Sequence, residues 1–438
     1  DSRAINGRPL IFLFPGQGAQ GPGMGALLYD REPIYRETID YCADFIETLT
    51  GQDLRPLIHG DGQMSHEEVR ERLKQTSVAQ PALFVVEYAL AQVYLELGIQ
   101  FGGMLGHSLG ELVAACLAGV YSLDDGLRMI CLRSSLVQDC PTGSMLAVML
   151  SRDELLEILP EGLEIAAENY PAGCVVSGPD EEIEKFQELL SDQRVGFQAL
   201  ETSHAFHSRM LDPAEEKFRA DLEEFKFRSP EKLIVSNVTG RPLEEEEAKD
   251  PAYWASQMRQ QVRFSEGLQQ FPLDDHPVLL ELGPGSTLSG FVSRHDSKLE
   301  TLITIPSISN SYGFIDPLEN VGKLWELGTE VDWSCHEDGS DLTLLPLPTY
   351  PFQSRYHWKN AQISSEGLEY EFPLPLYEFG WTEKAVSDDS IVEHSGPWIV
   401  FADRYGFADS LVSRLKETGS SVIRVSPGDS FEEVSEFE

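Results

Sequence analysis

The pentapeptide at residues 106–110, Gly-His-Ser-Leu-Gly, is the feature that most restricts the folds open to this chain. It fits the pattern G-x-S-x-G, in which a sharp turn between a strand and a helix exposes a serine hydroxyl. A short apolar stretch ends near Leu105, and an Ala/Leu-rich helical run extends over residues 109–119. Amides at the start of that helix would lie beside a developing anion. Because such turns also occur without catalysis, Ser108 becomes a candidate nucleophile if the chain supplies a base, an oxyanion hole and a substrate anchor.

Apolar patterning around this turn predicts an α/β fold. A core resembling that of the α/β-hydrolases is expected over residues 10–142 and 204–300, beginning with a buried strand at residues 10–14. Between the two parts, residues 143–203 follow the order β-α-β-β-α-β. That order is typical of a ferredoxin-like subdomain, here inserted into the core.

The remaining segments flank this core. Residues 1–9 are polar and are expected to be a residual upstream linker. Residues 301–360 are rich in proline and aromatic residues and are expected to form an irregular linker across a surface. Residues 361–438 begin as a polar linker and continue as strand, helix and strand. We expect a partial Rossmann-like segment there, with the chain ending inside that domain.

Composition limits the partners. Lys and Arg number 33 against 73 Asp and Glu, a net charge of −40, which disfavours binding to nucleic acid or to an anionic membrane. Any anion must therefore be held locally, by arginines and helix N-termini. The six cysteines lack C-x-x-C spacing, so neither a metal site nor a disulfide framework is indicated, and a cytoplasmic location is expected. The sequence has no apolar run of about 18 residues, the length typical of a membrane span.

A glycine-rich turn follows the first predicted strand. Residues 16–21 fit G-x-G-x-x-G, the pattern of dinucleotide-binding turns. A Rossmann unit needs a second strand that ends in an acid about 20 residues on. Here residues 33–49 look helical and Pro22 interrupts the expected helix; the lysine of a phosphate-binding loop is also missing. The turn is then either structural or a source of amides for an oxyanion.

A base and an anchor come from two further segments, each with a structural alternative. His204 and His207 lie between a predicted strand and a helix, where a histidine can face a cleft or simply cap the structure. No acid stands out as an orienting partner, so a backbone carbonyl could fulfil that role. A hydrolase-type alternative would use His276 or His295 with an aspartate. Arg133, within an apolar helix, either extends to solvent or presents its guanidinium to a carboxylate.

Five motifs together resemble the malonyl-CoA:acyl carrier protein transacylase family, and more narrowly the acyltransferase domain of a modular type I polyketide synthase. They are Phe-Pro-Gly-Gln-Gly-Ala-Gln at 14–20, Gln-Pro-Ala-Leu-Phe at 80–84, Gly-His-Ser-Leu-Gly-Glu at 106–111, Ser-His-Ala-Phe-His-Ser at 203–208 and Glu-Leu-Gly-Pro-Gly at 281–285. The resemblance extends over residues 10–358, since residues 347–358 resemble the linker that follows such domains. Residues 371–438 more weakly resemble the start of the structural subdomain that precedes a ketoreductase.

The resemblance implies a role for several residues. Ser108 would be the nucleophile and His207 the general base. The amides of Gln17 and Leu109 would form the oxyanion hole, and Arg133 would pair with the free carboxylate of the extender unit.

Other pocket residues are implied by the same resemblance. Gln80, His107 and Asn169 resemble supporting residues. Phe206 fits the malonyl-selecting form of its motif, because methylmalonyl enzymes of the family typically carry Tyr-Ala-Ser-His there. Leu109 agrees, since methylmalonyl enzymes often have glutamine at that position.

The activity implied is the loading of malonyl from malonyl-CoA onto the phosphopantetheine of an acyl carrier protein through an acyl-serine, in polyketide biosynthesis. No tightly bound cofactor and no metal are expected. The expected partners are malonyl-CoA, the carrier protein, and ketosynthase and ketoreductase domains of the same polypeptide. Two alternatives remain: a serine hydrolase that removes acyl groups, and a non-catalytic scaffold between neighbouring domains.

Overall fold

The computed structural model describes residues 7–60, 62–295, 302–309, 315–333, 396–402 and 406–425. The chain divides into two compact units, residues 1–345 and 346–438, which are described separately. Residues 1–6 of the expected upstream linker and the proline-rich motif at 347–358 lie outside the described residues.

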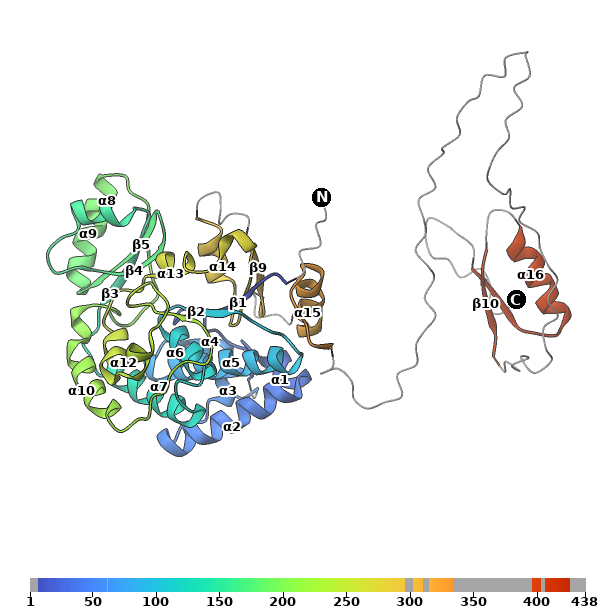
Figure 1. Cartoon of the computed structure of the whole chain (residues 1–438), viewed down its shortest axis with the longest axis horizontal. Coiled ribbons are helices and arrows are strands. Elements are labelled where there is room, and N and C mark those ends of the chain that lie inside the picture. Colours follow the sequence, from blue (N-terminus) through green and yellow to red (C-terminus); the bar gives the residue numbers. More distant parts are fainter. Residues whose placement is uncertain are drawn as a thin grey trace, which may run out of the picture. The chain divides into compact units, whose positions relative to one another are not determined.

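A five-stranded parallel sheet forms the centre of the first unit, in the order β7-β2-β1-β8-β9 (Figure 1). Its strands are β1 (Leu10–Phe14), β2 (Gly103–Gly106), β7 (Ile234–Val235), β8 (Val278–Glu281) and β9 (Ile303–Pro306). Strands β1, β2 and β8 are buried along their whole length. Such continuous burial is expected for parallel strands with helices on both faces. The predicted α/β class is therefore confirmed.

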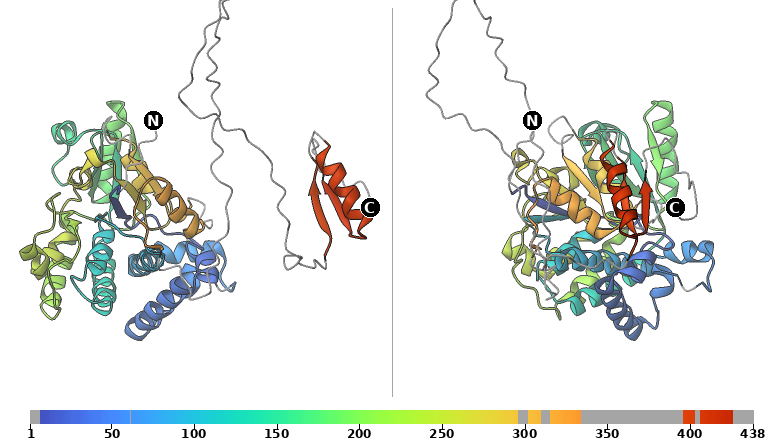
Figure 2. Two further views of the ribbon diagram at one scale, coloured as in Figure 1. Left: turned by 45° about the vertical axis from the view of Figure 1, so that its right-hand side comes forward. Right: turned by 90° about the vertical axis from the view of Figure 1, so that its right-hand side faces the viewer.

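Helices surround this sheet. Those of the first unit outside the small sheet are α1 (Ala26–Arg31), α2 (Pro33–Thr50), α3 (Arg55–Ile58), α4 (His66–Leu73), α5 (Thr76–Glu96), α6 (Leu109–Leu117), α7 (Leu123–Gln138), α10 (Asp212–Leu222), α11 (Glu245–Lys249), α12 (Pro251–Gln257), α13 (Phe264–Leu268), α14 (Thr287–Val292) and α15 (Pro317–Glu326), with 3₁₀ turns at Arg209–Leu211 and Leu273–Asp275. Helix α2 packs on α5, buries Tyr35, Ile39, Cys42 and Ile46, and lies on the outside of the unit (Figure 2). The helical spacing of these apolar residues produces that face.

Helix α5 is long and apolar enough to cross a membrane by length and composition. However, 83% of its apolar window is buried inside the protein, where α2, α6 and α7 pack against it. This environment is that of the central helix of a globular fold.

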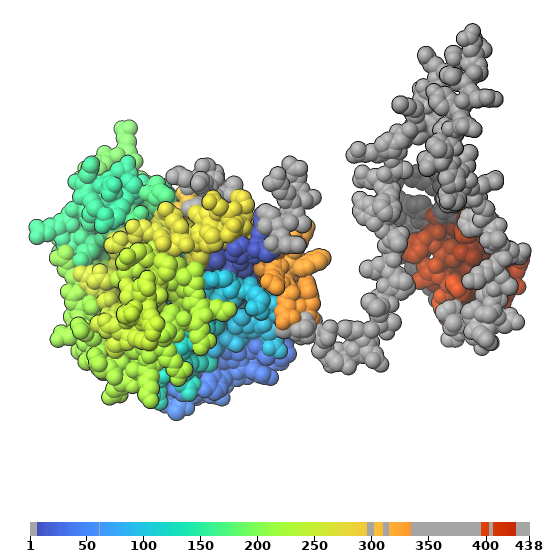
Figure 3. All heavy atoms as spheres, in the orientation of Figure 1, coloured from blue at the N-terminus to red at the C-terminus, as the bar shows by residue number. Residues whose placement is uncertain are grey.

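The small sheet is antiparallel and lies beside the main one. Its order is β4-β5-β3-β6, and its elements are β3 (Ser144–Val148), α8 (Arg152–Ile158), β4 (Glu164–Tyr170), β5 (Gly173–Gly178), α9 (Asp180–Asp192) and β6 (Phe197–Ala199). Strand β4 packs against α13 and α14 of the main body, and the Glu168 amide donates to the Val262 carbonyl. In Figure 3 these residues form a lobe, coloured teal to green, whose surface adjoins that of the main body. The contact creates a junction between the two sheets.

Two regular elements occur where an irregular linker was expected, so that expectation was wrong for part of residues 301–360. Strand β9 adds to the edge of the main sheet, and helix α15 begins where the Asp316 side chain accepts a hydrogen bond from the Leu318 amide. The short Ile303-Thr304-Ile305 run was overlooked because its strand character depends on pairing with β8.

The second unit contains β10 (Trp398–Phe401), α16 (Phe407–Glu417) and β11 (Val422–Val425) among its described residues. The two strands pair in parallel, and Val400, Ala408 and Val422 form a small core. This strand, helix and strand correspond to the elements predicted for the end of the chain.

The glycines of the pentapeptide permit close packing at the end of β2. A Cβ on Gly106 would overlap the Glu111 amide nitrogen, and one on Gly110 would overlap the Phe14 carbonyl oxygen. Helix α6 can therefore approach β1 and β2 this closely only because Gly106 and Gly110 have no side chain.

We expect Gly110→Ala to lower the free energy of unfolding by about 3 kcal/mol or more, because the new methyl group would displace the backbone of β1. Gly290→Ala is the matched control, since a Cβ there meets nothing within 4 Å. Alanine inside α14 should change stability by no more than about 1 kcal/mol, and in the favourable direction. Urea denaturation of both variants measures the difference; equal stability would contradict the packing argument.

Candidate active site

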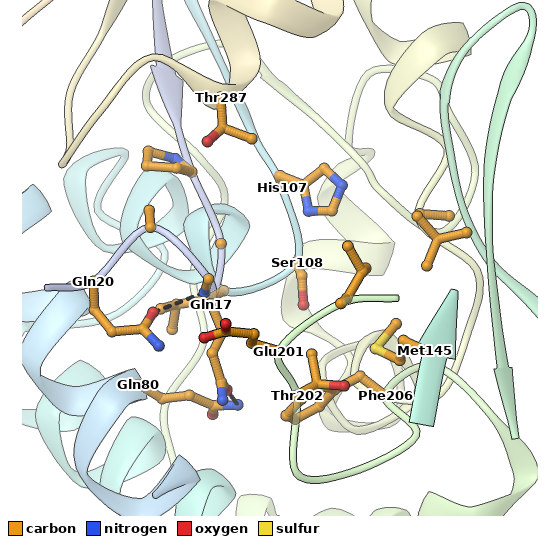
Figure 4. A pocket seen from close by; sticks show the side chains of 18 of the residues that line it. Gln17, Gln20, Gln80, His107, Ser108, Met145, Glu201, Thr202, Phe206 and Thr287 are labelled. Carbon is orange, nitrogen blue, oxygen red and sulfur yellow. Dashed lines mark hydrogen bonds between the residues drawn. The ribbon is translucent and has the colours of Figure 1, made fainter. Parts of the chain in front are cut away.

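A cavity of about 600 Å³ opens at the junction of the two sheets. It is lined by the turn after β1, the start of α6, strands β3 to β6, and the segment that precedes α10. Figure 4 shows Gln17, His107, Ser108 and Phe206 directed into this space. The cavity therefore gathers residues that are far apart in the sequence.

Ser108 occupies the turn between β2 and α6 with a strained backbone, at φ 52° and ψ −105°. Few residues other than glycine adopt a positive φ, and such strain persists where the surrounding structure enforces it. The Asn237 side chain provides part of that enforcement: its Oδ1 accepts from the Ser108 amide over 2.6 Å, and its Nδ2 donates to the Gly106 carbonyl over 2.7 Å. Gln257 Nε2 donates to the Ser108 carbonyl over 2.7 Å.

A buried polar cluster continues beneath the turn. Glu111 contacts the Tyr253 hydroxyl and accepts from Gln257 Nε2 over 3.0 Å. Burial raises the pKa of Glu111 to about 7, an effect that its hydrogen bonds reduce. Asn237, Gln257 and this cluster were not predicted from the sequence. One signal was available for Asn237: it follows β7, at the carboxyl end of a parallel strand beside β2, where functional side chains tend to gather.

His207 lies beside the serine. Its Nε2 is 2.7 Å from Ser108 Oγ, and its Nδ1 donates to the Gln260 carbonyl oxygen over 2.7 Å. Because a carbonyl oxygen can only accept, the proton of the neutral ring resides on Nδ1 and leaves Nε2 free to accept from the serine. A backbone carbonyl thus orients the imidazole, as the sequence analysis allowed.

The His207 pKa is shifted strongly downward, from 6.5 to about 3. Burial is the main cause, the positive charge of Arg133 is the second, and the hydrogen bond to Gln260 opposes them. The ring is therefore neutral at pH 7, which is the form that can take a proton from a serine.

Both residues predicted to supply amides for an oxyanion line the cavity that contains Ser108. Leu109 is the first residue of α6, so its N–H has no carbonyl partner within the helix. Gln17 lies in the turn after β1 and lines the same cavity. Its side chain is held by Gln80, whose Nε2 donates to Gln17 Oε1 over 3.0 Å, and by Thr76 at 3.4 Å. These contacts fix the turn beside Ser108.

Arg133 is buried behind this wall and is not among the residues that line the cavity. Its Nη1 donates to Gln80 Oε1 over 2.6 Å, whereas its Nε has no hydrogen-bond partner among the described residues. Burial lowers the Arg133 pKa to about 10, so the side chain remains charged at pH 7. Arg133 is therefore a buried cation with an unused donor, beside the lining residue Gln80, and it does not extend to solvent.

The other predicted pocket residues meet at the cavity wall. His107 Nε2 donates to Asn169 Oδ1 over 2.8 Å, and burial lowers the pKa of His107. Phe206 is buried and contributes an aromatic wall near His207.

The hydrolase-type alternative based on other histidines does not fit the geometry. His276 is exposed, and His295 is bonded to Ser265 Oγ at 3.1 Å and to the Phe291 carbonyl at 2.9 Å. Neither lines the cavity that contains Ser108. Within the described part of the chain, no group of three His, Cys, Asp or Glu side chains is placed to hold a metal ion.

Comparison with known proteins identifies the family. Residues 11–304 match the family model described as acyl transferase domain. This chain belongs to the acyl transferase domain family. A phenolphthiocerol/phthiocerol polyketide synthase protein of Mycobacterium tuberculosis (strain H37Rv) is 35% identical over 353 residues, which are 80% of this chain and 23% of that protein. The chain therefore spans less than a quarter of the length of that relative.

Solved structures of acyltransferases are also similar to this chain. The acyltransferase domain from the second module of the salinomycin polyketide synthase is 33% identical with a TM-score of 0.70, over 79% of this chain and 80% of that one. Malonyl CoA-acyl carrier protein transacylase from Burkholderia pseudomallei is 31% identical with a TM-score of 0.58, over 66% of this chain and 97% of that one.

The low pKa of His207 predicts that Ser108 stays reactive in mild acid. An uncharged serine reagent such as phenylmethylsulfonyl fluoride should inactivate the protein at nearly the same rate at pH 7.5 and pH 5, because His207 remains neutral over this interval. For a histidine at its ordinary pKa, the neutral fraction would instead be roughly thirtyfold smaller at pH 5 than at pH 7.5, and the rate would fall with it. The second-order rate constant of inactivation, measured from the change in intact-protein mass, distinguishes a lowered pKa of His207 from an ordinary one. An inflection of this rate constant near pH 6.5 would refute the burial argument.

Proposed function

We propose that this domain transfers a malonyl group from malonyl-CoA to the phosphopantetheine thiol of an acyl carrier protein through an ester on Ser108. The observation that carries the proposal is the 2.7 Å contact between Ser108 Oγ and His207 Nε2 inside a cavity backed by a buried arginine. The similarity to polyketide synthases and to a malonyl CoA-acyl carrier protein transacylase supports the substrate class.

In the first half-reaction, His207 Nε2 takes the proton from Ser108 Oγ as the oxygen attacks the thioester carbonyl carbon. The tetrahedral intermediate collapses with cleavage of the carbon–sulfur bond, and the departing CoA sulfur takes the proton back from His207. In the second half-reaction the carrier's thiol gives its proton to His207 and attacks the ester. Ser108 Oγ leaves and is reprotonated, so each half-reaction returns the imidazole to its neutral form.

The Leu109 and Gln17 amides stabilise the oxyanion in this proposal. A donor in a comparable site contributes roughly 3 kcal/mol to transition-state stabilisation. The strained turn supports the same step, because Asn237 and Gln257 hold the Ser108 backbone and so keep the Leu109 amide at the start of α6.

Arg133 selects the acyl group. Its unpartnered Nε is a buried charged donor, and a buried donor without a partner is costly unless a ligand satisfies it. The malonyl carboxylate provides that partner. It also either replaces Gln80 Oε1 as the acceptor of the hydrogen bond from Arg133 Nη1 or shares that donor with it. Phe206 and Leu109 restrict the space beside the acyl α-carbon, which favours malonyl over its methylated analogue.

The finer organisation belongs to the same proposal. The parallel order of the main sheet and the strand–turn–helix at Ser108 support an α/β-hydrolase-like core, and the order β4-β5-β3-β6 supports a ferredoxin-like subdomain. We place the domain in the cytoplasm, without a tightly bound cofactor, beside ketosynthase and ketoreductase domains of one polypeptide. The second unit would then be the start of the structural half of a ketoreductase.

Incubation with malonyl-CoA should add the mass of one malonyl group to the wild-type chain and none to Ser108→Ala, because the hydroxyl is the acyl acceptor. Subsequent addition of a phosphopantetheinylated carrier protein should transfer that mass to the carrier. Labelling that persists in Ser108→Ala would refute the nucleophile. Loss of the acyl group to water at the same rate with and without carrier would favour the editing hydrolase, and no labelling at all would favour a scaffold.

Arg133→Ala should lower kcat/KM for malonyl-CoA by about 30- to 5000-fold, the range expected on removal of one partner of a buried charge pair. Hydrolysis or transfer of acetyl, which has no carboxylate, should not fall in parallel. Arg128→Ala is the matched control, since it removes an exposed arginine from the same helix. A parallel loss with both acyl groups would show that Arg133 is needed for folding and not for selection.

A further inference from the structure

The mouth of the cavity carries two cationic side chains, both from the end of α4. Among the residues that line the cavity, the lysine and arginine residues are Arg70 and Lys74. They are four residues apart, so they share one face of that helix. Glu201 is the acidic residue in the same lining. The lining thus carries more Lys and Arg than Asp and Glu, whereas the whole chain has a net charge of −40.

The present partners of these cations are weak. Arg70 Nη1 lies 3.3 Å from Glu67 and Lys74 Nζ 2.6 Å from Glu71, and all four side chains are at least half exposed. Ion pairs of that kind contribute little to stability and exchange readily with solvent. A phosphate group presents more charge and more acceptor atoms than a single carboxylate, and so can compete for both cations.

The substrate chemistry requires a phosphate near the entrance of this cavity. The thioester must reach Ser108 inside the cavity, while the opposite end of the pantetheine arm carries a phosphate and must remain at the entrance. The same arm, with the same phosphate, occurs in CoA and on the carrier protein. Long-range repulsion from the acidic surface makes a local cationic contact necessary for either substrate.

We propose that Arg70 and Lys74 bind the phosphate at the end of the pantetheine arm, in both half-reactions. This inference rests on the proposed acyl transfer. Leu73, between the two cations in sequence, also lines the cavity, and its carbonyl accepts from Gln20 Nε2 over 3.2 Å. This bond ties the end of α4 to the glycine-rich turn that contains Gln17. The phosphate contact is thereby linked to the wall of the acyl site.

The test measures acylation of Ser108 in the full chain by malonyl-CoA, malonyl-phosphopantetheine and malonyl-pantetheine, which differ in their phosphates. In the double variant Arg70→Gln/Lys74→Gln, the ratio of KM for malonyl-phosphopantetheine to KM for malonyl-pantetheine should rise about tenfold, as expected for loss of one or two exposed charge contacts. Malonyl-CoA should show at least the same rise. Glu201→Gln should lower the ratio, because it removes the competing carboxylate.

Arg72→Gln is the matched control. Arg72 is an exposed cation of the same helix, but it does not line the cavity. An equal rise in this variant would mean that the general electrostatic field is responsible, and would overturn the site. A rise confined to malonyl-CoA would also overturn it, since the nucleotide phosphates would then be the groups recognised. Acylation of wild type by malonyl-pantetheine tests the proposed acyl transfer separately, because that substrate carries no phosphate.

Discussion

The strained backbone at Ser108 is the constraint on which the rest of the site depends. A residue with a side chain is held at φ 52° at the end of a buried parallel strand, and this position is possible only because Gly106 and Gly110 leave space for α6. Strain of this kind costs of order 1–3 kcal/mol and must be supported by surrounding contacts. Asn237 and Gln257 provide that support from two other elements, with bonds to the Ser108 amide and carbonyl. The serine is thus positioned by the close packing of α6 on β1 and β2 and by the segments that contain Asn237 and Gln257.

Burial gives the site its chemical character. It lowers the pKa of His207 so that a histidine without an acidic partner is a neutral base, and it leaves Arg133 as a charged group with an unused donor. The two effects reinforce each other, because the arginine's charge further disfavours protonation of the histidine. A carboxylate bound to Arg133 would offset that charge and raise the basicity of His207. In the proposed reaction, binding of the correct acyl group would therefore also prepare the base.

Local patterns predicted the α/β class and the elbow, because a glycine-flanked serine after an apolar strand is visible in the sequence itself. The roles of the other residues that line or back the cavity were implied by the resemblance to the transacylase family. The sequence did not reveal Asn237, Gln257 or the carbonyl of Gln260. These groups act through contacts across about 50 to 150 residues of sequence. Strand β9 was missed for a related reason, since its few β-branched residues form a strand only beside β8.

The chemical groups that are available can be read from the sequence: Gln17 and Ser108 in glycine-flanked turns, followed by Arg133 and His207, already indicate an acyltransferase of this family. Their protonation and their hydrogen-bond partners, in contrast, are set by the tertiary structure. The tautomer of His207, the burial of Arg133 behind Gln80 and the cationic mouth formed by α4 follow from how the two sheets and the helix α4 meet. The physical reason is that proton affinity and hydrogen-bond partnership depend on the surrounding solvent and neighbours, which the chain acquires only when distant segments pack.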